Sequence, residues 1–291
     1  MSASTIDSAF ETHRPRLMAL AYRLLGSRSD AEEIVQDAWL RWHQADRAAI
    51  RDPEGWLVTT TTRLGIDRLR LARTEREVYP GPWLPEPLTV DDSPGPEQQA
   101  DVAGQVSLAY LALLEKLGPE ERAAFLLKDV FDYDYPQIAE LLGHTEANCR
   151  QMVSRARTRV QAERPRFAVA ADTHRRLLES FMHAMQRGDR ESIMALLHAD
   201  ARLVSDGGGK VTAVIRPLEG AQRIADLYWT VARRVGDDAE LRLGHVNGEP
   251  ALLRFHEGTL HSISTIVVDE DGRITQVLSV LNPDKLRGLL A

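Results

Sequence analysis

The chain has 291 residues, enough for about two domains of ordinary size with sizeable buried cores. Its formal net charge of −7 excludes a uniformly basic DNA-binding protein, so any contact with nucleic acid must come from local clusters of positive charge. The single cysteine, Cys149, excludes an internal disulfide and fits a reducing compartment. We expect a cytoplasmic protein, because no signal peptide is recognisable and no apolar run approaches the roughly 20 residues that span a bilayer.

The first segment, residues 5–76, is predicted to be helical throughout. Its second helix is expected to start at a capping box formed by Ser29 and Glu32. A third helix should begin near Pro53 and run through four consecutive threonines at residues 59–62. Because β-branched residues are poor helix formers, the presence of these threonines in a helix needs another explanation. Hydroxyls beside arginines suit contact with a nucleic-acid backbone.

Positive charge is concentrated in two segments. Residues 63–76 hold five arginines against two acids, and residues 146–166 hold six arginines against two acids. Between them, residues 80–101 contain no lysine or arginine, five acids and six prolines. Such a segment cannot fold by itself, and it could extend to about 70 Å, so two basic helical patches are expected to flank a flexible acidic linker.

Residues 134–160 predict a helix-turn-helix. Pro136 suits the first turn of one helix, Gly143 can end that helix in the left-handed conformation, and Thr145 can cap the next. An apolar stripe from Cys149 to Val160 should face the first helix. The outer face then carries side chains that can read base edges or hold phosphates: Asn148, Arg150, Gln151, Ser154, Arg155 and Arg157. The alternative is an ordinary helical hairpin with a solvated basic face.

Residues 170–291 predict an α+β domain, in which helices come first and an antiparallel run of strands follows. Helices are expected at residues 177–185, 193–197 and 220–235. Strands are expected at residues 201–206, 211–218, 239–246, 251–258, 260–269 and 273–281. The fold class is therefore a multidomain chain, with two all-α domains followed by an α+β domain.

These segments resemble a known family. Residues 10–43, FETHRPRLMALAYRLLGSRSDAEEIVQDAWLRWH, and the following DPEGWLVTTTTRLGIDRLR resemble region 2 of extracytoplasmic-function (ECF) sigma factors of bacterial RNA polymerase. The stretch LGPEERAAFLLKDVFDYDYPQIAELLGHTEANCRQMVSRARTRV resembles their region 4. The resemblance implies region 2 at residues 5–76, a linker at 77–104, region 4 at 105–165 and a further domain at 170–291.

The resemblance also implies roles for individual residues. Docking on the clamp helices of the largest polymerase subunit is implied for Glu33, Gln36, Asp37 and Arg41. Capture and melting of the −10 element is implied for residues 56–73, with Trp56, Thr60, Arg63, Asp67, Arg68, Arg70 and Arg73 as contacts. The 146–157 helix would read the −35 element. Gln151 and Met152 depart from the residues that many relatives carry, so the preferred −35 sequence stays open.

The C-terminal segment resembles the NTF2-like or SnoaL-like cone. Three short motifs, WLPEP, DGGGK and NPDKL, resemble signatures of the ECF subgroup with a fused SnoaL-like domain, in which that domain stands in for a separate anti-sigma factor. The implied regulatory residues are Trp83, Leu84, Pro85, Asp206, Gly207, Gly208, Gly209, Lys210, Asn282, Pro283, Asp284 and Lys285. We expect the three motifs to lie close together and to restrain the spacing of the two DNA-binding regions. Trp83→Ala and Asp206→Ala should then change transcription more than stability.

Two alternatives belong to other functional classes. The cone could be an isomerase-like or cyclase-like enzyme with a small ligand, using Asp200, Asp206, His245, His256 or His261 as acid–base groups. The whole chain could instead be a stand-alone helix-turn-helix regulator without a polymerase partner. We expect neither catalysis nor a cofactor, and we expect no metal, because the nine histidines and one cysteine show no ligand spacing. The expected partners are core RNA polymerase and promoter DNA, with no membrane.

Overall fold

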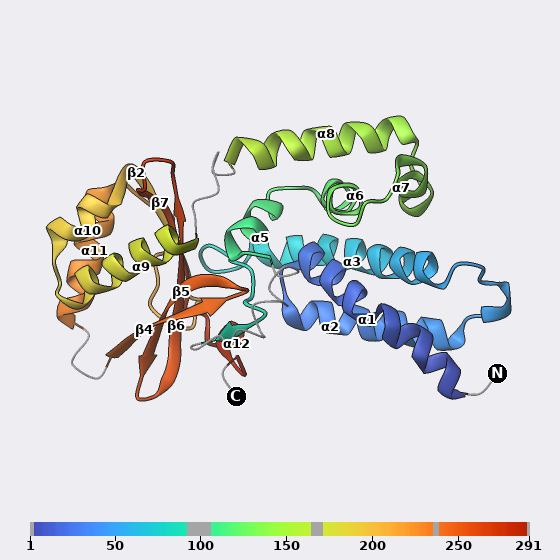
Figure 1. The fold of residues 1–291 in the computed structure, drawn as a ribbon, viewed down its shortest axis with the longest axis horizontal. Coiled ribbons are helices and arrows are strands. Elements are labelled where there is room, and N and C mark those ends of the chain that lie inside the picture. The colour runs from blue at the N-terminus through green and yellow to red at the C-terminus, as the bar shows by residue number, and fades with distance from the viewer. Residues whose placement is uncertain (1–2, 92–105, 164–170, 235–238, 290–291) are drawn as a thin grey trace. The chain divides into compact units, whose positions relative to one another are not determined.

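The computed structural model describes residues 3–91, 106–163, 171–234 and 239–289. The chain forms two compact units: residues 1–77 with 113–163, which are helical, and residues 78–112 with 164–291, which contain a sheet (Figure 1). Linker residues 92–105 and the two arginines Arg164 and Arg166 lie outside the described part. Across the described ranges, no helix carries an apolar stretch long enough to cross a membrane.

The helical unit contains two groups of helices. In the first group, α1 (Ala3–Leu25), α2 (Arg28–Gln44) and α3 (Pro53–Glu77) pack on one another, with a short 3-10 helix, η1 (Arg47–Ala49), before α3. In the second group, α6 (Pro119–Asp129) packs on α7 (Tyr135–Leu142) and α8 (Glu146–Glu163). α6 also contacts α1 and α3, so the two groups form one body. α5 (Leu108–Leu114) lies at the boundary between the units in the chain.

The start of α2 differs from the prediction. Ser27 is the N-cap instead of Ser29, because its side chain accepts a hydrogen bond from the Asp30 N–H at 3.2 Å. Gly26 ends α1 at a positive φ of 66°, and Ser27 is then extended at φ −127°, the conformation of an N-cap. The glycine turn places the cap immediately after itself, which moves the helix start two residues upstream of the predicted position.

The helix-turn-helix is confirmed. Asp134 caps α7 through a reciprocal pair of hydrogen bonds with Gln137, and Gly143 ends α7 at φ 71°. The Thr145 hydroxyl accepts a hydrogen bond from the Asn148 N–H at 3.2 Å and so caps α8. The apolar stripe of α8 is buried as expected, from Cys149 to Val160.

Two of the four threonines in α3 are not available to nucleic acid. Thr61 and Thr62 are fully buried, and their hydroxyl oxygens have no hydrogen-bond partner. The expectation that these hydroxyls grip a backbone is therefore wrong for this pair. Their β-branched side chains fill the interior of the helical unit. Thr60 is half-buried, and its hydroxyl donates to the Trp56 carbonyl at 2.9 Å.

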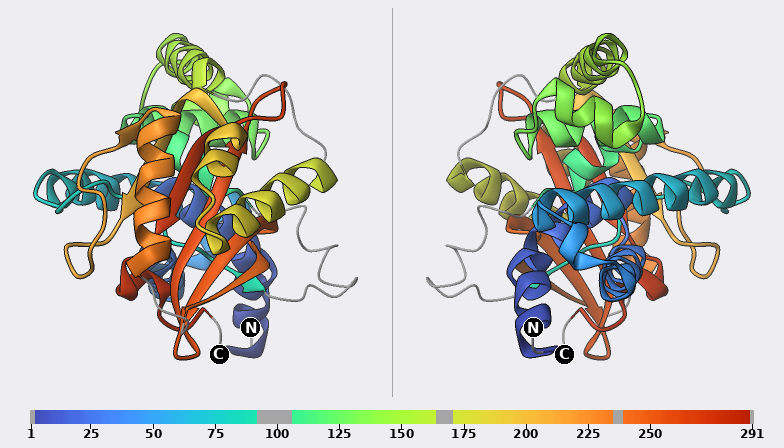
Figure 2. Two further views of the ribbon diagram at one scale, coloured as in Figure 1. Left: turned by 90° about the vertical axis from the view of Figure 1, so that its left-hand side faces the viewer. Right: turned by 90° about the vertical axis from the view of Figure 1, so that its right-hand side faces the viewer.

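The second unit is a sheet with helices on one face (Figure 2). These helices are α9 (Ala171–Gln186), α10 (Arg190–Leu196) and α11 (Ala221–Arg234). The short α12 (Pro283–Leu286) follows the last strand and lies on the other side of the sheet (Figure 1). The strands are β1 (Val90–Asp91), β2 (Leu197–Asp206), β3 (Leu218–Glu219), β4 (Ala239–Val246), β5 (Glu249–His256), β6 (Thr259–Val268) and β7 (Ile274–Val280). Their order in the sheet is β1-β4-β5-β6-β7-β2-β3.

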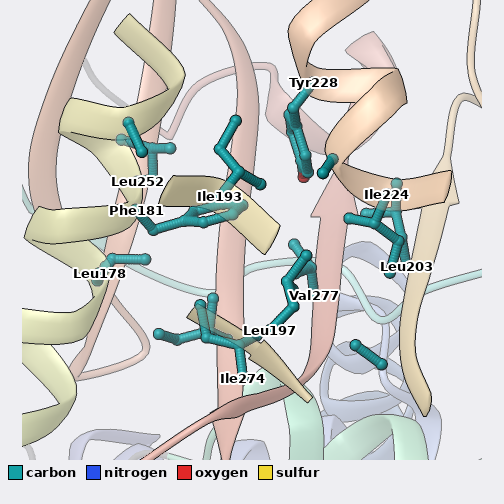
Figure 3. Packing of buried hydrophobic residues seen from close by; sticks show 14 of the residues in the cluster. Leu178, Phe181, Ile193, Leu197, Leu203, Ile224, Tyr228, Leu252, Ile274 and Val277 are labelled. Carbon is teal, nitrogen blue, oxygen red and sulfur yellow. The ribbon is translucent and has the colours of Figure 1, made fainter. Parts of the chain in front are cut away.

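The core of this unit lies between α9, α10, α11 and the sheet. Figure 3 shows Phe181 and Tyr228 projecting from α9 and α11 towards strand residues such as Leu252 and Val277. The Phe181 and Tyr228 rings meet edge to face, with their centroids 5.2 Å apart. Burial of this continuous apolar face supplies most of the unit's stability.

The strand predictions need two corrections. Residues 211–217 form no strand, because β2 pairs with this region only at Leu218–Glu219 and Pro217 lacks the N–H that a ladder needs. The sheet is also not wholly antiparallel, since β2 runs parallel to β7, with Asp206 opposite Val280. Parallel pairing brings the carboxyl ends of both strands to the same edge of the sheet, although about 70 residues separate them in the chain.

The first part of the linker is packed against the sheet unit. Leu84 is 3% exposed, Pro85 is also buried, and Val90–Asp91 pair with β4. Residues 78–91 therefore belong to the sheet unit, and the expectation of a flexible linker is wrong for them. This segment cannot build a core alone, but the sheet unit supplies the surface on which its apolar residues are buried.

The partnerless hydroxyls give a stability prediction. Thr61→Val replaces a buried, unpaired hydroxyl by a methyl group of the same shape, so the free energy of unfolding should rise by about 1 kcal/mol. Thr60→Val is the control, because it deletes a hydroxyl that has a partner and should bring no such gain. Urea denaturation of the full chain measures both. A loss of stability in Thr61→Val would show that its hydroxyl is satisfied.

Candidate functional site

One face of α2 is polar and exposed. Glu33, Gln36 and Arg41 are exposed and Asp37 is half-buried, while the opposite face of the helix packs into the core. These positions are spaced by three or four residues and form one strip along the helix. Leu40 lies within the strip and is 42% exposed. The strip combines charge with an uncovered apolar side chain, which suits a protein partner.

The arginines of α3 are held by groups inside the helical unit. Arg63 donates to the Leu141 carbonyl of α7 at 3.1 Å. Arg70 donates to Asp67 at 3.0 Å and to Glu120 of α6 at 2.6 Å. Asp67, another of the predicted −10 contacts, thus orients a neighbouring arginine in this structure.

The other predicted contacts of α3 lie along the same helix. Arg68 pairs with Asp30 and Glu75, both at 3.0 Å, and these carboxylates raise its pKa against the lowering effect of burial. Arg73 is exposed. The half-buried Trp56 packs against Trp42, with a ring separation of 5.5 Å, so Trp56 has a packing role here.

An open cleft of about 430 Å³ lies among α3, α6 and α8. Four arginines line it, namely Arg70, Arg73, Arg155 and Arg159, together with Glu120 and Glu121. Glu121 pairs with Arg155 at 3.4 Å and also with Arg159, while Glu120 pairs with Arg70. The carboxylates of α6 thus occupy positions beside the guanidinium groups that phosphates would take in a nucleic-acid complex.

The outer face of α8 divides into two parts. Arg150, Gln151 and Ser154 are exposed near its N-terminal end, and the Arg150 guanidinium lies 4.3 Å from the centre of the Tyr135 ring and 3.2 Å from Glu146. Asn148 is half-buried beside His144.

Further along α8, Arg157 forms a salt bridge with Asp129 of α6 through two guanidinium nitrogens, with one N–O distance of 2.9 Å. This carboxylate raises the pKa of Arg157. Met152 is buried and lines the cleft. The structure thus leaves the first half of the helix presented to solvent and ties the second half to α6.

A second site lies in the sheet unit, centred on the fully buried carboxylate of Asp206. One carboxylate oxygen accepts hydrogen bonds from the Tyr79 hydroxyl at 2.6 Å, and the other accepts from the Leu84 N–H at 2.9 Å and from the Lys285 ammonium at 2.6 Å. Lys285 also donates to the Leu84 carbonyl, and the Asn282 amide donates to the Tyr79 oxygen at 2.9 Å. We call these five residues the linker clasp.

The neighbourhood of the clasp explains the three short motifs. The Trp83 ring centre lies 4.0 Å from the Lys285 nitrogen, which is a cation–π contact. Gly208 has φ 61°, and a Cβ there would lie about 2.5 Å from the Asn282 amide. A Cβ on Gly209 would meet Pro80 at 2.5 Å. Glycine is therefore required for the close approach.

The predicted proximity of the WLPEP, DGGGK and NPDKL motifs is confirmed. Gly207 is buried in the same loop as Gly208. Lys210 and Asp284 form an exposed ion pair at the rim, and Pro283 begins α12. Burial and the hydrogen bond to Asp206 raise the pKa of Tyr79 above its ordinary value, so the phenol stays protonated.

Sequence reasoning missed two residues that fasten the linker. Tyr79 stands outside the motifs and gave no signal. Asn247 accepts hydrogen bonds from the Leu88 and Thr89 N–H groups at 2.9 and 3.2 Å, and it donates to the Val106 carbonyl at 3.0 Å. The Asn247-Gly248 pair is typical of a hairpin turn, and nothing in the sequence indicates that the Asn247 amide also binds the linker.

The acid–base candidates do not gather around one point. Asp200 and His256 are exposed, Asp206 belongs to the linker clasp, and His245 lies on β4 opposite Pro250. His261 is half-buried on β6. In the part of the chain that the structure describes, no group of three or more His, Cys, Asp or Glu side chains could hold a metal ion.

Comparisons with known proteins agree with this architecture. The Sigma-70 region 2 family matches residues 9–75, and the Sigma-70 region 4 family matches residues 107–160. ECF RNA polymerase sigma factor SigJ of Mycobacterium tuberculosis is 36% identical over 294 residues, covering 97% of this chain and 93% of SigJ. Probable ECF RNA polymerase sigma factor SigI of the same species is 31% identical over 289 residues, covering 98% of this chain and 96% of SigI.

The crystal structure of SigJ covers 96% of this chain and 97% of its own chain, with a TM-score of 0.74 at 35% identity. The similarity extends through the helical modules and the C-terminal sheet, which confirms the resemblance to ECF sigma factors read from the motifs. Taken with the helix-turn-helix of α7 and α8, these matches show that the chain belongs to the ECF sigma factors of RNA polymerase.

Proposed function

We propose that this sigma factor docks on core RNA polymerase through the polar strip of α2 and reads its promoter with α3 and α8, while the linker clasp restrains the two modules. The observation that carries the proposal is the clasp, because it fastens the segment that follows α3 to the SnoaL-like domain. Each part of the proposal has its own support.

The α2 strip fits a polymerase-docking role. Glu33, Gln36 and Arg41 are exposed without a core-packing function, and Leu40 adds apolar area at the centre. A rim of charges around an apolar side chain is the arrangement that favours association with a second protein. Family membership supports binding to the clamp helices of the largest subunit, in the cytoplasm.

The exposed first half of α8 suits reading of the −35 element. Arg150 and Gln151 can form paired hydrogen bonds with guanine or adenine edges in a major groove, and Ser154 can contact either base or backbone. Arg155 and Arg157 would hold backbone phosphates after exchange of their present carboxylate partners. The buried Met152 shapes the helix packing and does not read bases.

Binding of the −10 element by α3 requires a rearrangement of the helical unit. Arg63 and Arg70, two of the predicted contacts, are bound to α7 and α6 in this structure. A nucleic-acid strand along α3 would compete with Glu120 for Arg70. The arrangement is therefore a closed state, and promoter binding separates α3 from α6 and α7.

The linker clasp opposes this separation. Residues 78–107 join α3 to α5, and fastening residues 79–89 through Asp206, Lys285 and Asn247 shortens the tether between the two modules. A shorter tether limits how far the modules can move apart. The SnoaL-like domain thus acts in cis and stands in for a separate anti-sigma factor, and the chain carries out no bond chemistry.

Recognition of the −35 element gives the first test. Arg150→Ala should weaken binding and relax base preference at one −35 position, by about 1–3 kcal/mol for a lost base contact. Arg159→Ala, at an exposed position of the same helix, should weaken binding without changing the preference. Selection from a promoter library with purified holoenzyme measures both, and an unchanged −35 profile in Arg150→Ala would rule out the contact.

Release of the clasp should raise promoter output. Tyr79→Phe removes one donor to Asp206, and Trp83→Ala removes the cation–π partner of Lys285. Run-off transcription with core polymerase should increase for both. Arg202→Met, an exposed change on β2, should match wild type. Reduced or unchanged output from clasp variants with a wild-type thermal midpoint contradicts the restraint.

The contacts of Asp206 change the expectation from the motifs, because replacement of this buried carboxylate should lower the stability of the fold strongly. Asp206→Asn leaves the 9%-exposed Lys285 ammonium without its anionic partner, and the free energy of unfolding should fall by about 3–5 kcal/mol. Adding Lys285→Met should recover part of the loss. Urea denaturation monitored by circular dichroism checks the pair, and a single variant as stable as wild type would mean that the charge is solvated.

A further inference from the structure

A cavity of about 220 Å³ lies inside the SnoaL-like domain, between α11 and the sheet. Its walls are mainly apolar, with Leu203, Leu252 and Val231 among the lining residues. Tyr228 of α11 and Leu203 of β2 also line it, and Figure 3 shows both side chains in the core of the domain. The exposed Thr212 also lines the cavity, so the cavity reaches the surface at the segment that follows DGGGK.

Arg254 of β5 brings a positive charge into this apolar wall. It is the cation among the described lining residues, and no carboxylate of the described chain pairs with it. Other arginines of this unit differ in this respect, since Arg190, Arg202 and Arg242 pair with Asp226, Glu219 and Glu240. A half-buried guanidinium without an anion is unusual, because burial of a charge is costly unless it is paired.

The partner that Arg254 does have is neutral. One guanidinium nitrogen donates to Nδ1 of His261 at 2.6 Å, and burial together with Arg254 lowers the pKa of His261, so the imidazole is uncharged at neutral pH. Burial also lowers the pKa of Arg254, but a guanidinium is so strongly basic that it stays protonated. Arginine has five N–H donors, and the bond to His261 uses one of them.

Polar groups near Arg254 complete one side of the cavity. The Ser264 and Ser279 hydroxyls lie 2.8 Å apart, and both residues line the cavity. Tyr228 is buried beside them and shares a hydrogen bond with Ser279, and burial raises its pKa to about 12, so its hydroxyl stays protonated. The polar groups therefore offer several donors and a single positive charge, and the rest of the wall offers apolar contact.

We infer that this cavity binds a small monocarboxylate, with the carboxylate on Arg254 and the hydroxyls of Tyr228 and Ser279, and with an apolar body against Leu203, Leu252 and Val231. The planar guanidinium matches a carboxylate with two parallel hydrogen bonds. One positive charge balances a monoanion, whereas a phosphate dianion would remain partly uncompensated. A cavity of about 150 Å³ holds benzene, so this volume suits a body of about six to eight carbon atoms.

The site stands independently of the proposed restraint by the clasp, because it rests on the cavity and its charge alone. The probes are hexanoate and its neutral isostere hexanamide, titrated into the full chain by isothermal calorimetry. Hexanoate should bind, and hexanamide should bind at least about tenfold more weakly. Equal affinities, or no heat from hexanoate, overturn the inference without recourse to any variant.

Two variants locate the site. Arg254→Met should lower hexanoate affinity about ten- to a hundredfold, the range for a lost charge-assisted hydrogen bond. Arg202→Met is the matched control, since it removes an exposed arginine from β2, the strand that contributes Leu203 to the wall, and it should leave affinity unchanged. Circular dichroism checks that Arg254→Met folds. Wild-type affinity in a folded Arg254→Met chain would place the bound hexanoate elsewhere and overturn the assignment.

Discussion

The buried carboxylate of Asp206 is the constraint on which the sheet unit and its linker depend. A fully buried anion is tolerated only when donors surround it. Gly208 supplies a local donor to Asp206, and the others come from Tyr79, Leu84 and Lys285, far from Asp206 in the chain. A buried polar network in which some groups lack partners is less stable than an apolar core, so all of these segments must be in place at the same time. The charge therefore defines one arrangement of linker and domain.

The helical unit solves a different electrostatic problem. A chain with net charge −7 carries many arginines on the helices predicted to contact DNA, and α6 supplies Glu120 and Glu121 as their partners in the absence of nucleic acid. A deeper pair supports the same packing: Arg122 is 2% exposed and donates to Glu115 at 2.7 Å and to the Leu24 carbonyl at 2.8 Å. The pairs formed by the exposed arginines exchange more easily, whereas the buried Arg122 joins α6 to α1 through the Leu24 carbonyl.

Sequence patterns correctly predicted the features that depend on interactions between residues close together in the chain. The turn between α7 and α8 follows from Gly143 and Thr145, whose conformational preferences act within a few residues. The glycines of DGGGK also signalled a close backbone approach, and the three motifs were correctly expected to meet.

The remaining features depend on contacts between distant segments. The parallel pairing of β2 with β7, the burial of Leu84 and the second role of Asn247 each need a partner that the local sequence does not reveal. The prediction for Thr61 and Thr62 was wrong for the same reason, because burial in the core, and not contact with a nucleic-acid backbone, accounts for these two residues. The roles of individual residues toward polymerase and DNA stay predictions, because they need those partners.

At the end of β2 and directly after β7, neighbouring side chains point to opposite faces of the sheet. Ser205 and Leu281 line the interior of the cone, while their neighbours Asp206 and Asn282 belong to the clasp. Each of these cavity-lining residues is thus the direct chain neighbour of a residue that fastens the linker. Any free energy that links occupancy of the interior to closure of the tether acts equally in both directions: an occupant that favours closure is itself held more tightly by the closed form, by the same factor.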